Sequence, residues 1–219
     1  MIKFEYILIN GIRLIHIFED DWFSKKEIVK SIILNHLKIT NKKIYSRECN
    51  IRNVSSKKCR EFLDNNHIQG YSRCKYKIGL FYKNELVSVM TFGYRKINNK
   101  EQFELIRFCN KINTSVVGSA SKLFKHFIFN NNIEHIVSYA DISIFTGDIY
   151  TKLGFTFKHL SSPNYFWFID NKRFHRFKFN KKKLIKEGFD SNKTGNEIMN
   201  NRGYYKIWSC GQYRFDWYR

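Results

Sequence analysis

The segment from Val116 to Phe129, VVGSASKLFKHFIF, changes character halfway along its length. Its first half holds small residues, and its second half places Leu123, Phe124, Phe127 and Ile128 at the spacing of one helix face. The segment therefore predicts a loop that enters a helix. At such a helix N terminus, free backbone N–H groups and the helix dipole favour an anion such as a pyrophosphate. The candidate anion-binding residues are Gly118, Ser119, Ala120 and Ser121.

Strand and helix patterns alternate around this segment. In chain order the pattern predicts a hairpin over 78–92, strands over 103–109 and 135–141, a helix closed by Gly154, and strands over 155–160 and 165–170. This order predicts an α/β fold in which a mixed (α+β) sheet is covered by helices.

The residues before this region predict a strand over 12–18 and a helix over 25–37, with capping-box spacing between Ser24 and Glu27. Acidic residues follow the predicted strand at Glu19, Asp20 and Asp21. We interpret them as stabilising a helix N terminus rather than as metal ligands, and predict no metal site. A second helix is predicted to begin at Ser55 or Ser56.

The last part of the chain is the most basic, because residues 171–219 hold 13 Lys and Arg against 4 Asp and Glu. Thr194 and Glu197 have capping-box spacing before a short helix, and 204–218 predicts a hairpin that turns at Cys210 and Gly211. Charge and pattern together divide the chain into 1–50, a central domain over 51–170, and a basic, aromatic-rich module over 171–219.

The whole chain of 219 residues has a formal charge of +20, which favours a polyanionic partner. The alternative is a Lys-, Asn- and Ile-rich chain shaped by an AT-rich genome. The aromatic content of 17% predicts a folded protein. The five cysteines lack metal-ligand spacing and are interpreted as reduced thiols. With no signal segment and no run long enough to span a bilayer, we predict a cytoplasmic protein without a membrane partner.

Three residues are candidates for a polar catalytic site. His67 would transfer protons near neutral pH, Asp141 would orient it from the carboxyl end of a strand, and Tyr150 would protonate a leaving group. Each has a structural alternative: His67 would cap a helix, and Tyr150 would pack a helix against the sheet.

The candidate nucleic-acid contacts lie in the basic module, where cations alternate with aromatic residues. They are Arg173, Arg176, Lys178, Lys181, Lys182 and Lys183. The alternative is a solvated charged face without a partner.

The small residues at Gly118 and Ala120, in this element order, resemble the acetyl-coenzyme A loop of the GNAT acyltransferase fold, and Asp148 to Phe155, DIYTKLGF, resembles its second signature. Ser115 stands where the GNAT loop has Gln or Arg. The resemblance covers about 51–170. It implies a GNAT-like domain, acetyl-coenzyme A as a cofactor, and Tyr150 as a general acid.

A second resemblance covers nearly the whole chain. The opening GIRLIHIFEDDW, residues 11–22, followed by a Lys-rich helix, is similar to the end of the very-short-patch-repair-like nuclease domain of Hef-like phage homing endonucleases. Segments such as NHIQGY at 66–71 and GYYKIW at 203–208 continue it. The upstream nuclease part, with its catalytic acidic and histidine residues, is missing. This resemblance implies a phage-type protein that binds DNA without cutting it.

The leading hypothesis from sequence is therefore a DNA-binding relative of homing endonucleases, with no assigned cofactor. The alternative is a GNAT-type acyltransferase that uses acetyl-coenzyme A and modifies nucleic acid, as a GNAT-like phage DNA-modification protein does. The sequence does not define an oligomeric state.

Overall fold

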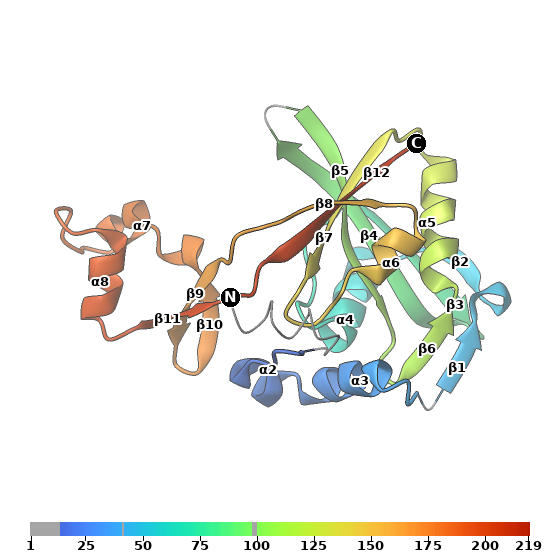
Figure 1. Ribbon diagram of the computed structural model, residues 1–219, viewed down its shortest axis with the longest axis horizontal. Coiled ribbons are helices and arrows are strands. Elements are labelled where there is room, and N and C mark those ends of the chain that lie inside the picture. The colour runs from blue at the N-terminus through green and yellow to red at the C-terminus, as the bar shows by residue number, and fades with distance from the viewer. Residues whose placement is uncertain (1–13, 41, 98–99) are drawn as a thin grey trace.

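The computed structural model describes residues 14–40, 42–97 and 100–219 (Figure 1). A large sheet forms the body, and a smaller sheet with its own helices extends away from it. The α-helices are α2 (Glu19–Ser24), α3 (Lys26–His36), α4 (Ser56–Asn66), α5 (Ser119–Asn130), α6 (Asp148–Lys152), α7 (Lys181–Lys186) and α8 (Gly195–Asn201). The 3-10 turns are η1 (Ser46–Glu48) and η2 (Arg176–Phe179).

The large sheet has seven strands in the order β2-β3-β4-β5-β7-β12-β8. Their bounds are β2 (Asn50–Asn53), β3 (Tyr76–Tyr82), β4 (Glu85–Ile97), β5 (Lys100–Asn110), β7 (His135–Asp141), β8 (Thr156–Leu160) and β12 (Gln212–Tyr218). The pair β5 and β7 is parallel, and the other neighbours are antiparallel. The predicted mixed α/β sheet is confirmed.

The parallel pair β5 and β7 opens like a wedge. Phe103 to Leu105 pair with Ile136 to Ser138, and beyond Leu105 the pairing of the two strands ends although both continue. A short parallel pair, β1 (Lys42–Tyr45) with β6 (Thr114–Val117), leads into α5. This split between the two strands creates the space for the site described below.

Helix α5 packs on the large sheet through the face predicted from its spacing. Leu123, Phe124 and Phe127 are buried, and the ring of Phe127 stacks on Phe92 of β4 at 3.5 Å between centroids. Other local predictions are also confirmed. Lys83 and Asn84 both have positive φ in the β3–β4 turn, and Ser55 caps α4 by accepting the backbone N–H of Lys58.

The smaller sheet has the order β10-β9-β11, from β9 (Tyr165–Ile169), β10 (Lys172–His175) and β11 (Tyr205–Trp208). Helices α7 and α8 cover one of its faces around buried Trp167, Leu184 and Met199. We call residues 161–211 the insert, because they lie between the paired strands β8 and β12. The predicted capping box of Thr194 and Glu197 forms at the start of α8.

Near the start of the described chain, the predicted strand over 12–18 and the predicted Ser24 capping box are wrong. Residues 14–18 are irregular rather than a strand, while 12 and 13 lie outside the described residues. Ile15 still packs against a cluster that includes Ile28 and Ile144, so an apolar run is buried here without strand pairing. The acids that follow form the first turn of a separate helix, α2. The Ser24 capping box is also absent, because the Ser24 hydroxyl donates to the carbonyl of Asp20.

The predicted hairpin over 204–218 does not form, because β11 pairs with β9 whereas β12 pairs with β7 and β8. The predicted module over 171–219 is therefore not a separate unit to its end, because its last strand, β12, belongs to the large sheet. At the neck of the insert, Gly211 has φ +99, and a Cβ there would lie 2.6 Å from the carbonyl oxygen of Ser161. Only glycine permits this close approach.

Candidate active site

Two cavities meet at the wedge between β5 and β7. The first, which we call the wedge pocket, has a volume of about 320 Å³ and is lined by the ends of β5 and β7 that do not pair with each other, together with α3 and α6. The second, the open cleft, has a volume of about 1400 Å³ and lies between the large sheet, α2 and the insert. The residues that line both cavities are Ile68, Gln69, Arg107 and Asp141.

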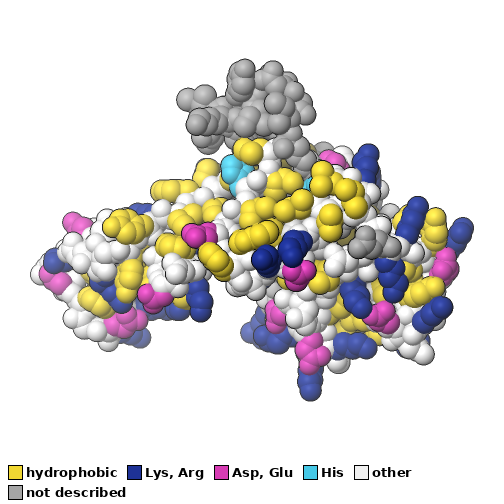
Figure 2. All heavy atoms as spheres, turned by 90° about the horizontal axis from the view of Figure 1, so that it is seen from below, with side chains coloured by type: hydrophobic (Ala, Val, Ile, Leu, Met, Phe, Trp, Pro, Cys, Tyr) yellow, Lys and Arg dark blue, Asp and Glu magenta, His cyan; other side chains and the backbone are white. Residues whose placement is uncertain are grey.

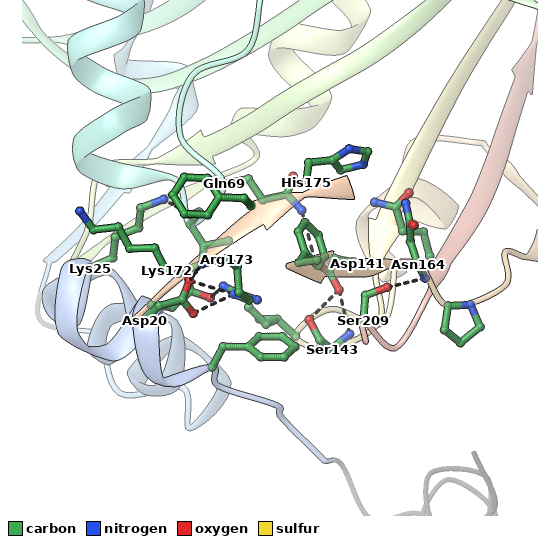
Figure 3. Close-up of a pocket in the computed structure, with 18 of the residues that line it drawn as sticks. Asp20, Lys25, Gln69, Asp141, Ser143, Asn164, Lys172, Arg173, His175 and Ser209 are labelled. Atoms are coloured by element: carbon green, nitrogen blue, oxygen red, sulfur yellow. Dashed lines mark hydrogen bonds and ion pairs between the residues drawn. The ribbon is translucent and has the colours of Figure 1, made fainter. Parts of the chain in front are cut away.

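Asp141, at the carboxyl end of β7, is held by hydrogen bonds on both carboxylate oxygens (Figure 3). Oδ1 accepts the backbone N–H of Ser143 at 3.0 Å and its hydroxyl at 2.5 Å, and Oδ2 accepts the side-chain amide of Gln69 at 3.3 Å. These donors fix the carboxylate at the junction of the two cavities. It is placed to accept a proton from a group bound in either one.

His67 lines the wedge pocket, but its geometry changes the role expected for it. Its Nδ1 accepts the backbone N–H of Gln69 at 3.1 Å, so Nε2 carries the proton of the neutral ring. Burial, with Arg107 and Lys25 nearby, lowers the pKa of His67 to about 3. At neutral pH the imidazole is therefore a hydrogen-bond donor through Nε2 rather than a proton-transferring base.

Tyr150 of α6 also lines the wedge pocket. Its hydroxyl donates at 3.3 Å to the carbonyl of Tyr139, on the end of β7 that does not pair with β5, and its ring stacks on Phe215. Burial raises the pKa of Tyr150, which keeps the phenol protonated. The residue thus packs α6 against the sheet, which is the structural alternative expected from the sequence, and its role as a general acid stays a prediction.

Arg107 is the functional candidate that sequence analysis missed. Its Nε donates to the carbonyl of Gly70 at 3.1 Å and its Nη1 to the carbonyl of Ile106 at 2.9 Å. Within the described residues it forms no ion pair with a carboxylate. Burial lowers the pKa of Arg107, yet a guanidinium stays charged at neutral pH. Arg107 therefore gives the junction a partly desolvated cation that lines the same two cavities as Asp141 and is suited to an anion or a developing negative charge.

The N terminus of α5 lies next to the wedge pocket. Gly118 has φ +77 and precedes the first turn, where Ser119, Ala120 and Ser121 follow. None of these residues lines either cavity, but the Ser119 hydroxyl donates at 3.0 Å to the side chain of Asn110, which does line the wedge pocket. Ser115 lies in β6, paired with Lys43 of β1. Asn110 therefore connects the wedge pocket to the helix N terminus.

The candidate nucleic-acid contacts divide into two groups. Arg173 is only 15% exposed in its side chain and forms ion pairs with Asp20, at 2.7 Å from Nε, and with Asp21. Its guanidinium also lies 3.9 Å from the ring of Phe18, so Arg173 ties α2 to the insert. The exposed cations are Arg176, Lys178, Lys181, Lys182 and Lys183. Figure 2 shows Lys and Arg side chains on the insert and on the body of the protein.

The carboxylates of Asp20 and Asp21 have their charge partner in Arg173. Among the described residues, no group of three or more His, Cys, Asp and Glu side chains is placed to bind one. All five cysteines are free. In the part of the chain that the structure describes, no helix combines the length and apolar character needed to cross a membrane.

A comparison of the sequence with protein families shows which family the chain belongs to. The model of the Mom protein family matches residues 48–215, and the chain belongs to that family. The match includes the expected central domain and extends through the insert to β12. It favours the alternative hypothesis over the leading one, and the homing-endonuclease relationship is not supported.

Among solved structures, the chain is similar to an acetyltransferase of Bacillus subtilis in complex with CoA. The two are 12% identical, the match covers 78% of this chain and 99% of that one, and the TM-score is 0.44. No curated protein sequence matches the chain.

Proposed function

We propose that this protein is a DNA-modifying enzyme that transfers an acyl group from a coenzyme A thioester to an amino group of a DNA base. The observation that carries the proposal is the meeting of two cavities of different character at Asp141 and Arg107. Its support also comes from the family, since Mom is a phage DNA-modification protein. The formal charge of +20 suits a polyanionic substrate.

The wedge pocket fits the thioester arm of coenzyme A. Beyond Leu105 the facing edges of β5 and β7 do not pair with each other, so their backbone groups are placed to hydrogen-bond the amides of an extended arm. The N terminus of α5, beyond Asn110, would hold the pyrophosphate. The proposed pyrophosphate-binding residues are Gly118, Ser119, Ala120 and Ser121.

When bound, coenzyme A would supply an activated acyl group as a thioester. Asp141 would accept the proton that the attacking amino group loses as its nitrogen forms the new bond to the acyl carbon. Arg107 would stabilise the negative charge that develops on the acyl oxygen. Tyr150 would donate a proton to the sulfur as the carbon–sulfur bond breaks, and His67 would orient a polar group through Nε2–H. The products are an amide on the base and free coenzyme A.

The first test concerns the α5 N terminus. A Cβ at Gly118 would lie 2.8 Å from the Ser46 hydroxyl and would require a left-handed conformation. Gly118→Val should therefore abolish acetyl-coenzyme A binding in calorimetry. Gly188→Val is the matched control, because Gly188 also has positive φ but has open space around it. Equal binding by both variants and the unchanged protein would remove this helix end from the cofactor site.

A second test concerns the exposed lysines of α7. Replacing Lys181, Lys182 and Lys183 together by Gln should weaken duplex DNA binding and lower the salt slope, log Kd against log salt concentration, by up to about 3, because each phosphate contact contributes roughly 0.9. The control removes the same charge from α4 at Lys57, Lys58 and Arg60, which are also exposed. Equal effects of the two triple variants would show a response to net charge alone.

A further inference from the structure

The small sheet of the insert has one face that no helix of the insert covers. In β9, Trp167 and Ile169 point into the core beneath α7 and α8, so Phe166 and Phe168 point to the opposite side. Residues paired directly across an antiparallel sheet share a face. Phe168 is paired with Arg173 and Tyr205, and Phe166 with His175 and Ile207.

We call this surface the aromatic face. Its members are Phe166, Phe168, His175, Tyr205 and Ile207, with Arg173 at one corner.

The aromatic face forms a wall of the open cleft. Phe166 and His175 line the cleft, and Figure 3 shows His175 and Arg173 on β10 on one side of it with Asp141 and Ser143 on another. Tyr205, on the outer strand β11, is 75% exposed and continues the face beyond the cleft. A planar group lying on Phe166 would therefore be in the cavity that also contains Asp141.

Cations border the same cleft. Lys172 and Arg176 line it from β10 and η2, and both are exposed. Arg173 is excluded from this role, since Asp20 and Asp21 neutralise it. An aromatic face that enters the cleft at Phe166 and is bordered by exposed cations is suited to a nucleic-acid strand, with bases on the rings and phosphates on the cations.

The proposed acyl transfer also limits where the target amino group of the DNA base can lie. The reactive carboxylate lies inside a cleft, and an amino group that is stacked and paired within a duplex does not reach such a site unless its nucleotide leaves the stack. We propose that the aromatic face stacks unpaired DNA bases, with Phe166 supporting the extruded target base in the cleft and Tyr205 supporting a neighbouring base. This inference rests on the proposed function for the identity of the nucleic acid.

The test measures binding without acetyl-coenzyme A, so it does not depend on catalysis. Fluorescence anisotropy compares a fully paired DNA duplex with the same duplex carrying one unpaired base. The unchanged protein should bind the second duplex more tightly. Phe166→Ala and Tyr205→Ala should each weaken binding to that duplex by about 5- to 150-fold, the factor that corresponds to the stacking of one base on an aromatic ring. Binding to the fully paired duplex should change little.

Trp208→Ala is the control, because Trp208 is 57% exposed but lies on the other face of the same sheet, beside Tyr165. The preference in question is for the duplex with one unpaired base over the fully paired duplex. If only the Phe166 and Tyr205 variants lost it, base stacking on the aromatic face would be supported even if acyl transfer to DNA were absent. Equal preference in all variants, or no preference in the unchanged protein, would overturn it even if acyl transfer occurred. Tighter binding of an RNA with the same unpaired base would also overturn the assignment to DNA.

Discussion

Asp141→Asn should reduce the rate of acyl transfer by about 10²- to 10⁴-fold, the usual contribution of a positioned general base. The amide keeps the size of the carboxylate, and a side-chain oxygen still accepts from Ser143, but the group no longer accepts a proton. Acetyl-coenzyme A should bind as before. The measurement is single-turnover release of coenzyme A in the presence of DNA, together with calorimetry of cofactor binding.

The matched control for this variant is Asp190→Asn, which alters a carboxylate in the loop between α7 and α8 that accepts the backbone N–H of Asn192. This variant should react at the normal rate. A normal rate for Asp141→Asn would exclude Asp141 as the base and leave the junction without one.

Trp167→Ala should destabilise the insert by about 3–5 kcal/mol, because truncating a buried aromatic residue removes its apolar contacts and leaves a cavity. Trp167 is 1% exposed and packs with Leu184, Ile198 and Met199. Hydrogen exchange should accelerate in α7 and α8 while the strands around Phe92 and Phe127, which belong to a separate core, keep their protection.

Trp208→Ala again provides the control, since its exposed ring should contribute little to stability. If Trp167→Ala accelerated exchange equally in the insert and in the large sheet, the two would unfold as one unit. Unchanged exchange in α7 and α8 would contradict the packing described for this core.

The elements predicted correctly from sequence are those that short-range chemistry determines. The Lys83-Asn84 turn, the Thr194–Glu197 capping box and the apolar face of α5 each depend on residues a few positions apart. The element order over 78–160 was therefore predictable, and with it the mixed sheet, except for strand β6 (Thr114–Val117), whose residues Val116 and Val117 were predicted to lie in a loop.

The errors arise where partners lie far apart in the chain. The pattern of 204–218 fits a hairpin, yet β12 finds its partners in β7 and β8, because the neck at Ser161 and Gly211 returns the chain to the large sheet. The strand predicted over 12–18 failed for a related reason. Ile15 is covered by α3 and the loop after β7, so its burial needs no neighbouring strand.

The candidate site was predictable in part. His67, Asp141 and Tyr150 all line the wedge pocket, and their side-chain chemistry made them visible in the sequence. Arg107 was missed because it lies in an alternating strand pattern, where a cation suggests a solvated face. The pairing of β5 with β7 ends at Leu105, and Arg107 and Asp141 lie beyond that point, where they line the same two cavities. Arg173 was expected to contact nucleic acid but forms an ion pair with Asp20 instead. This pairing was not visible in the sequence, because the two residues are separated by most of the chain.

The most direct test of the account is mass spectrometry of nucleosides from DNA incubated with the purified protein and isotopically labelled acetyl-coenzyme A. We expect a nucleoside heavier by one labelled acetyl group, released coenzyme A in equal amount, and loss of both with Asp141→Asn. Unmodified nucleosides and intact acetyl-coenzyme A, from folded protein that binds DNA, would contradict it.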